Sequence, residues 1–182
     1  MQTADAGSSA DRLPLGSGDS HLICGCMDAL DAATAFETAQ SDFQFEEMVG
    51  KNGQPLPRVQ CLQHAARPDG LIPVYRYPGN EDGDRYPSYP LGELGGRVCQ
   101  LAEAALERQL GSAALWGALA TTKTRDDGGY FNHVVVNYYR SEADFIAAHQ
   151  DKRLDIEHGS IIGSLSVCEC RLLVYRDLLS PA

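Results

Sequence analysis

The residues with the clearest chemical potential are His149 and Asp151, which are separated by a single glutamine. Side chains at positions i and i+2 of an extended segment point to the same face, so this imidazole and this carboxylate can converge on one point. Two histidines and one carboxylate bind non-haem Fe(II) and leave its other positions open. The tripeptide supplies two of those three ligands. It is short enough to occur by chance, and the alternative is a surface histidine beside a loop aspartate.

The segment upstream of this pair predicts a strand over residues 130–139, because it is rich in β-branched and aromatic side chains. Asn137 and Tyr139 stand at positions i and i+2 of that strand and therefore share a face. On their own they are equally typical of a strand-edge amide and a core aromatic. Residues 160–167 and 171–176 predict two further strands downstream.

Two helices and a hairpin are predicted in the first part of the chain. Residues 27–41 and 91–106 place apolar side chains at helical spacing. An Asn-Gly pair at 52–53 predicts a hairpin tip, and residues 71–77 predict a strand. The order of the predicted elements favours an α+β domain whose β-part is a sandwich or barrel. A helix and strands come first, followed by a long helix and then by successive strands.

The composition bounds the class of protein. A chain of 182 residues with 43% hydrophobic and 22% charged residues is typical of one globular domain, and excludes a collagen-like, coiled-coil or wholly disordered chain. No apolar run is long enough to span a membrane, so we expect no membrane partner. The first 20 residues lack an apolar signal core, and we therefore do not expect secretion.

The charge is unevenly distributed. The net charge is -10, but residues 1–50 hold nine acids and one base, so the rest of the chain retains room for a local basic surface. Residues 1–20 predict a disordered acidic tail, followed by a domain over residues 21–182. The six cysteines include two C-x-C pairs, which lack the usual spacing of structural zinc sites and indicate reduced intracellular thiols.

Residues 131–176 contain further motifs in a fixed order around the His-x-Asp pair. They read Phe-Asn, Asn-x-Tyr, His-x-Asp, Gly-Ser, Ser-x-Ser and Arg-x-x-x-x-Arg. This block resembles the AlkB family of Fe(II)- and 2-oxoglutarate-dependent dioxygenases, most closely the eukaryotic members that repair alkylated DNA bases. Upstream, residues 48–60 resemble the family hairpin that probes the duplex, and residues 71–79 resemble the strand that lines the base pocket.

The resemblance implies a double-stranded β-helix, or jelly-roll, with flanking amino-terminal helices and strands. Within that fold, His149 and Asp151 would bind Fe(II) and carry catalysis. Asn137 and Tyr139 would hydrogen-bond 2-oxoglutarate. The implied activity is oxidative demethylation of N-alkylated bases, as in DNA repair, with dioxygen as the oxidant and formaldehyde as a product.

The resemblance also implies a substrate side. Tyr75 and Tyr77 would line the lesion pocket, with Tyr77 stacking on a flipped base, which needs a replacement for its lost stacking. Arg58 would contact the nucleic-acid backbone near the lesion. Val49 stands where relatives place a wedge, although valine is small for that role. The expected partner is alkylated DNA or RNA, the expected state is a monomer, and the expected compartment is the nucleus, otherwise the cytoplasm.

The chain departs from the family pattern in three places. No histidine or arginine follows Arg176, so the second histidine ligand and the arginines that hold the far carboxylate of 2-oxoglutarate have no counterpart. We therefore expect a truncated chain without its carboxy-terminal strands, inactive and poorly folded by itself. Lys152 and Arg153 stand where DNA-repairing relatives carry acidic residues, which leaves the choice of base open. Residues 112–129 are longer than the matching segment of close relatives.

Two alternatives to an active dealkylase remain open from the sequence. One is a catalytically inactive relative that only binds nucleic acid or a protein. The other is an unrelated β-rich binding protein with a chance His-x-Asp, against which the ordered motifs of residues 131–176 argue.

Overall fold

The chain divides into two compact units in this computed structural model. The first unit comprises Met1–Glu37 with Ser166–Ala182, and the second comprises Thr38–Leu165. The part of the chain that the structure describes consists of residues 12–15, 20–23, 27, 29–50, 52–66, 69–73, 75, 86–110, 130–149, 151 and 161–167.

The first unit contains a small antiparallel sheet. Strand β1 (Arg12–Leu15) pairs with strand β2 (Ser20–Ile23), and helix α1 (Ala29–Asp42) follows, with its residues from Thr38 on in the second unit. The helix matches the one predicted over residues 27–41. Strand β1 lies inside the segment that the sequence predicts as a disordered tail, and the structure differs there because the backbone of that strand is paired in a ladder.

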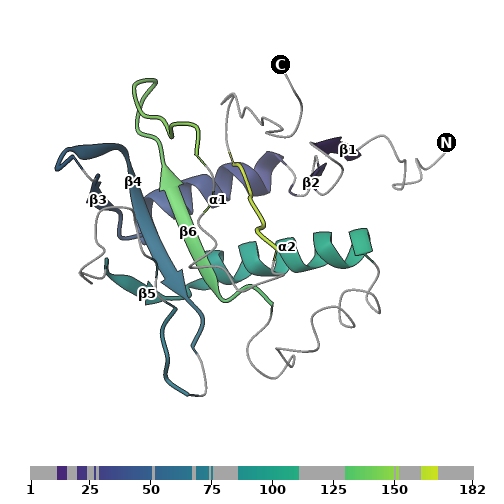
Figure 1. Ribbon diagram of the computed structural model, residues 1–182. Coiled ribbons are helices and arrows are strands. Elements are labelled where there is room, and N and C mark those ends of the chain that lie inside the picture. The colour runs from purple at the N-terminus through teal and green to yellow at the C-terminus, as the bar shows by residue number, and fades with distance from the viewer. Residues whose placement is uncertain are drawn as a thin grey trace. The chain divides into compact units, whose positions relative to one another are not determined.

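The second unit is built around one central strand, β4 (Pro55–His64). Strand β6 (His133–Tyr138) runs antiparallel to it, as the two neighbouring arrows of Figure 1 show. Strand β3 (Glu46–Val49) pairs antiparallel with the first part of β4, and β5 (Ser88–Pro90) pairs parallel with its end. Because it has neighbours on both edges, β4 is buried from residue 58 to residue 64.

The turn between β3 and β4 forms where the Asn-Gly pair predicts it. Gly53 has a φ of 73°, the left-handed region that glycine enters without steric cost. The Gly50 amide donates to the Gln54 carbonyl at 2.8 Å, and the Gly53 amide donates to the Gly50 carbonyl at 2.9 Å. The side chain of Asn52 accepts from the Gln54 amide at 3.2 Å. The turn therefore satisfies its own backbone and confirms the predicted hairpin.

Helix α2 (Glu93–Leu110) confirms the second predicted helix and packs closely on β4. A Cβ atom on Gly95 would collide with the side chain of Gln63 and would lie 2.9 Å from a methyl group of Leu91. The absence of a side chain at this position lets the helix approach the strand. One turn further along the helix, Cys99 is only 8% exposed and belongs to the core.

Helix α2 also anchors the entrance to β6. The Glu103 carboxylate accepts hydrogen bonds from the backbone amides of Tyr130 at 2.6 Å and Phe131 at 3.3 Å. Residues 161–165 cross the same region, where the Ile161 amide donates to the Tyr130 hydroxyl at 2.7 Å. A Cβ atom on Gly163 would lie 3.3 Å from the Phe131 ring, so this crossing also depends on a glycine.

Two predicted strands are not strands where the structure describes them. Residues 71–73 and 75 form no ladder, and neither do residues 161–167. Strand-forming side chains do not make a strand unless a neighbouring backbone supplies partners, and the described parts of these segments have none in a sheet. The predicted strand over residues 171–176 lies outside the described residues. The mixture of helices and sheet confirms the predicted α+β class.

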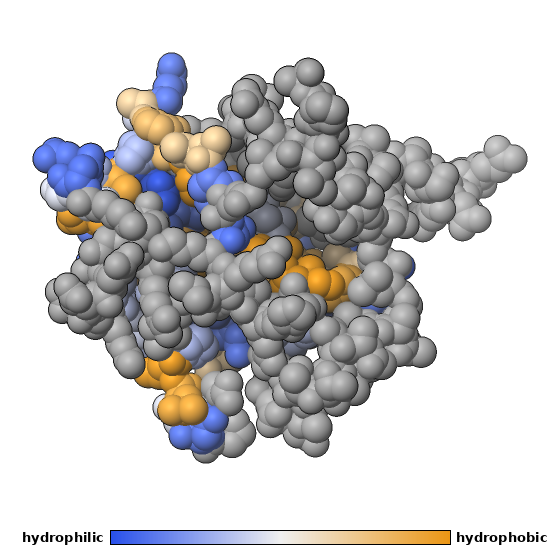
Figure 2. Space-filling view, viewed as in Figure 1, coloured by the Kyte–Doolittle hydropathy of each residue, from blue (hydrophilic) through white to orange (hydrophobic). Residues whose placement is uncertain are grey.

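No helix among the described residues is long and apolar enough to cross a membrane. Several large apolar side chains are nevertheless exposed, among them Leu71 at 64% and Phe145 at 56%. Figure 2 shows hydrophobic colour in separate patches on the face that it presents.

We predict that replacing Glu103 by alanine destabilises the second unit by about 1–2 kcal/mol, because two backbone amides at the start of β6 lose their acceptor. Glu103→Gln keeps one acceptor oxygen and should cost less. Urea unfolding followed by circular dichroism measures both. Equal stability of the alanine variant and the wild type would show that water replaces the carboxylate without cost.

We also predict that the two core thiols are unreactive in the native protein. Burial raises the pKa of Cys61, and burial together with the nearby Glu103 carboxylate raises that of Cys99 to about 11. Because the folded pKa values lie above the ordinary value of 9.0, these thiols favour folding at lower pH, and that stability is lost as the pH rises toward 11. Iodoacetamide labelling read by peptide mass spectrometry should modify both residues only after denaturation, and rapid native labelling would contradict this.

Candidate functional site

The predicted metal ligands His149 and Asp151 lie next to each other. His149 Nε2 is 3.5 Å from an Asp151 carboxylate oxygen, and both side chains are about half exposed, at 50% and 57%. His149 Nδ1 lies 2.8 Å from the Ala147 carbonyl oxygen, which can only accept a hydrogen bond. Nδ1 therefore carries a proton, and Nε2 is the ring nitrogen that faces Asp151.

This geometry fits two ligands of one metal ion. Ligand atoms that are each roughly 2.1 Å from an ion lie about 3–4 Å apart, and the bond from Nδ1 to a carbonyl orients the ring as it does in many metal sites. Among the described residues, no group of three or more histidine, cysteine and acidic side chains is positioned to hold a metal. Metal binding by His149 and Asp151 therefore stays a prediction.

The predicted co-substrate residue Asn137 stands opposite Gln60 in the pairing of β6 with β4. Its side-chain oxygen accepts two hydrogen bonds, from Gln60 Nε2 at 2.6 Å and from Arg58 Nε at 3.0 Å. Both donors are almost fully buried, with 1% and 4% of their surface exposed. Tyr139, the other predicted co-substrate residue, directly follows β6 and is half-buried.

The structure places Arg58 differently from a solvated surface residue. Its described hydrogen bond is to Asn137, and its burial removes most of the side chain from solvent. Contact of Arg58 with a nucleic-acid backbone stays a prediction. Gln60 was not singled out from the sequence, although it shares a strand face with Arg58 by simple alternation and could have been found that way.

The predicted pocket residue Tyr75 lies against β6. Its ring centre is 6.1 Å from that of His133, at an interplanar angle of 53°. His133 and Asn137 are four residues apart on one strand and therefore share a face. Tyr75 is thereby brought to the face that carries Asn137. Tyr77 lies outside the described residues, and its stacking role stays a prediction.

His133 is another residue to which the sequence assigns no role. It stands opposite His64 in the pairing of β4 with β6, and His64 Nδ1 lies 2.9 Å from the Ser88 hydroxyl of β5. Two imidazoles and a tyrosine ring thus border one end of the face that carries Asn137. The alternation of β6 is the signal that places His133 there.

The predicted wedge residue Val49 ends β3 beside the hairpin turn. Its side chain is 44% exposed, and the Tyr86 hydroxyl donates to its carbonyl at 3.3 Å. An exposed side chain beside a hairpin turn is accessible to a large partner. Insertion of Val49 into a duplex stays a prediction.

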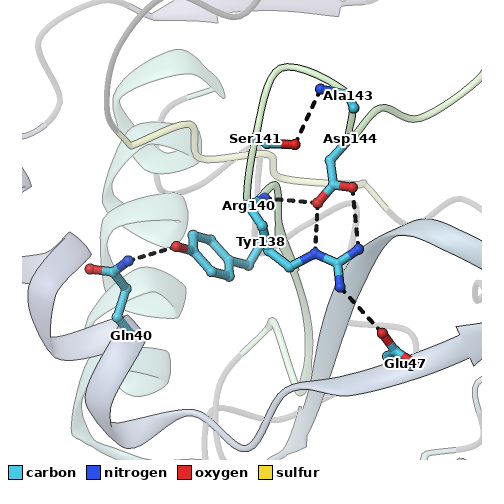
Figure 3. Close-up of polar contacts among 7 residues, drawn as sticks. All are labelled: Gln40, Glu47, Tyr138, Arg140, Ser141, Ala143 and Asp144. Atoms are coloured by element: carbon cyan, nitrogen blue, oxygen red, sulfur yellow. Dashed lines mark hydrogen bonds and ion pairs between the residues drawn. The ribbon is translucent and has the colours of Figure 1, made fainter.

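A cluster of charges holds the loop that leads from β6 to His149 (Figure 3). Asp144 is buried, and its carboxylate accepts from the Arg140 backbone amide at 2.8 Å and from the Arg140 guanidinium at 2.9 and 3.2 Å. These contacts raise the pKa of Arg140. Arg140 also reaches Glu47 of β3 at 3.3 Å, and the Phe145 amide donates to the Pro57 carbonyl of β4 at 2.8 Å.

The opposite side of β6 is fixed by the end of α1. The Gln40 amide donates to the Tyr138 hydroxyl at 2.7 Å, as Figure 3 also shows, and the Tyr138 ring packs on Phe45 with ring centres 5.3 Å apart. Alternation places Tyr138 on one face of β6 and Asn137 on the other. The site face is therefore backed by a packed layer.

A comparison with family models places the chain in a known class. The model of the 2OG-Fe(II) oxygenase superfamily matches residues 19–180. The chain belongs to the 2OG-Fe(II) oxygenase superfamily, which implies oxidative catalysis with Fe(II) and 2-oxoglutarate. A search of curated proteins returned no match.

We predict that Asp144→Ala lowers the thermal midpoint by several degrees, because it removes three hydrogen bonds to Arg140, one of them from the backbone. Glu47→Ala is the matched control. It removes only the exposed ion pair to Arg140 and should change the midpoint little. Differential scanning calorimetry decides, and equal effects of the two variants would contradict a special role for Asp144.

Proposed function

We propose that this protein removes N-alkyl groups from nucleic-acid bases by oxidation, within a double-stranded β-helix of the AlkB type. The observation that carries the proposal is the shared face of β6, which joins Asn137 to the aromatic side chain of Tyr75 by way of His133. A site for an acidic co-substrate beside an aromatic surface suits a base that must lie flat next to the oxidising centre.

The metal and co-substrate side uses four residues. His149 Nε2 and the Asp151 carboxylate would hold Fe(II), and Asn137 with Tyr139 would hold 2-oxoglutarate. When bound, Fe(II) and 2-oxoglutarate supply the oxidation: one dioxygen molecule converts 2-oxoglutarate to succinate and carbon dioxide and hydroxylates the N-alkyl carbon. The C–N bond of the hydroxymethyl group then breaks: the carbon leaves as formaldehyde, the base nitrogen takes the electron pair of the bond, and the hydroxyl proton passes to that nitrogen or to water.

The substrate side rests on aromatic stacking. Tyr75, with Tyr77 further along the same segment, would provide the surface on which an extruded base lies. The exposed Val49 at the β3–β4 hairpin would meet the neighbouring base pairs. Lys152 and Arg153, which follow the metal ligands, favour a substrate choice different from that of relatives with acidic residues there.

A second candidate is a relative that binds nucleic acid or a protein without turnover. It is favoured by one observation, namely that the described part of the chain supplies two metal ligands and no third. Two protein ligands hold a divalent metal more weakly than three do. Metal affinity and turnover therefore separate the two candidates.

The test uses the full chain with Fe(II), 2-oxoglutarate and short oligonucleotides that carry N-methylated bases, as DNA and RNA and as single and double strands. We expect formaldehyde and succinate in equal amounts and the loss of one methyl group from the oligonucleotide, read by mass spectrometry. His149→Ala and Asp151→Ala should abolish the activity and weaken Mn(II) binding, measured by electron paramagnetic resonance.

The matched control for these variants is Glu142→Gln, which changes an exposed carboxylate of the loop before the ligands. It should leave both metal binding and turnover unchanged. Binding of the methylated oligonucleotide without formaldehyde would favour the second candidate. Neither binding nor turnover with any of the oligonucleotides would overturn the proposed substrate class.

A further inference from the structure

The hydrogen-bond donors around Asn137 determine which end of its side-chain amide faces them. A guanidinium group donates hydrogen bonds and accepts none, so the Asn137 atom 3.0 Å from Arg58 Nε must be the oxygen. The same oxygen lies 2.6 Å from a side-chain end of Gln60, which must therefore be its NH₂ group. If the Asn137 amide were turned over, its NH₂ group would face the Arg58 N–H and the Gln60 NH₂ group, and both hydrogen bonds would be lost.

This orientation leaves Asn137 as a donor toward its surroundings. Its oxygen is taken by two neighbours, and its Nδ2 group, with two hydrogens, is engaged by neither of them. A ligand that meets Asn137 must then accept hydrogen bonds. Carboxylate and keto oxygens only accept, so 2-oxoglutarate presents acceptors at every polar atom.

The buried charge of Arg58 also favours an anionic ligand at this site. Its side chain is 4% exposed, and among the described residues it forms no ion pair. A buried cation is costly unless an anion compensates it. Gln60 is even more buried, and its side-chain oxygen has no hydrogen-bond partner among the described residues. Two buried polar side chains, Arg58 and Gln60, thus both donate to the Asn137 oxygen and fix the orientation of its amide.

We propose that Arg58 and Gln60 are positioning residues of the 2-oxoglutarate site. They hold the Asn137 amide with Nδ2 presented to a carboxylate, and Arg58 adds positive charge beside that carboxylate. The inference rests on the proposed function in one respect, that Asn137 meets 2-oxoglutarate. It gives Arg58 a role on the co-substrate side of the protein and requires no nucleic acid.

The test measures 2-oxoglutarate binding by titration calorimetry on the full, Mn(II)-loaded chain without oxygen. In Asn137→Asp, the acceptor for Arg58 and Gln60 is kept while the Nδ2 donor becomes a second oxygen. The thermal midpoint should therefore be retained or raised while the Kd for 2-oxoglutarate rises roughly tenfold or more. A purely structural role of Asn137 would not separate the two readouts in this way.

Gln60→Glu tests the positioning itself. A carboxylate at residue 60 accepts where Gln60 donated, so it competes with the Asn137 oxygen for the Arg58 donor and favours the turned-over Asn137 amide, with its oxygen toward the ligand. We expect a similar loss of 2-oxoglutarate affinity, and the same for Arg58→Met. Gln63→Glu is the matched control, because Gln63 is buried on the opposite face of β4, near the start of α2, where the helix end tolerates negative charge.

The outcomes are distinct. An equal loss in Gln63→Glu and Gln60→Glu would overturn the inference while leaving the proposed function in place. Wild-type affinity in Asn137→Asp would overturn the inference together with the co-substrate role of Asn137, but would leave the proposed dealkylation in place. The expected pattern of 2-oxoglutarate binding without turnover of any methylated oligonucleotide would support the inference and overturn the substrate class. A wild-type chain that binds no 2-oxoglutarate would overturn both.

Discussion

The antiparallel pairing of β4 with β6 is the interaction on which the rest of the second unit depends. It sets Gln60 opposite Asn137 and His64 opposite His133, so residues from distant parts of the chain form one polar face. A slip of one residue would send every one of these side chains to the opposite face, against α2. The positions of these polar side chains therefore depend on the register of β4 and β6. The packing of Tyr138 on the other face of β6 helps to fix that register.

The central strand carries more polar side chains than a core strand normally does. Arg58, Gln60, Gln63 and His64 are all buried, and each must recover the hydrogen bonds that it loses with water. Arg58 and Gln60 recover theirs on Asn137, and His64 recovers one on Ser88. Apolar residues at these positions would pack without the free-energy cost of unsatisfied buried polar groups. Arg58, Gln60 and His64 share one face of β4, and the polarity of that face is consistent with the proposed polar ligand.

Sequence patterns over neighbouring residues predict the local structure of this chain, but they do not predict which distant segments pair. The Asn-Gly turn, the two helices and β6 follow from turn chemistry and periodicity over neighbouring residues. The central place of β4 does not follow, because its partners are remote in sequence, and the bond from Arg58 to Asn137 spans 79 residues. The segment around Leu71 shows the converse: strand-forming side chains without a backbone partner remain outside the sheet. The proximity of His149 and Asp151 was predictable because both residues lie on one short segment.

The hairpin and the loop before the metal ligands are mechanically joined through the same strand. Arg140 connects the loop to Glu47 of β3, and Phe145 connects it to Pro57 near the start of β4. Asp144 holds Arg140 from within the loop, so the position of His149 is referred to the β3–β4 hairpin rather than to β6 alone. The hairpin that carries Val49 and the loop that leads to His149 are therefore both anchored on β4. The proposed substrate side and the proposed metal side share this anchor, so they need no separate element to keep them aligned.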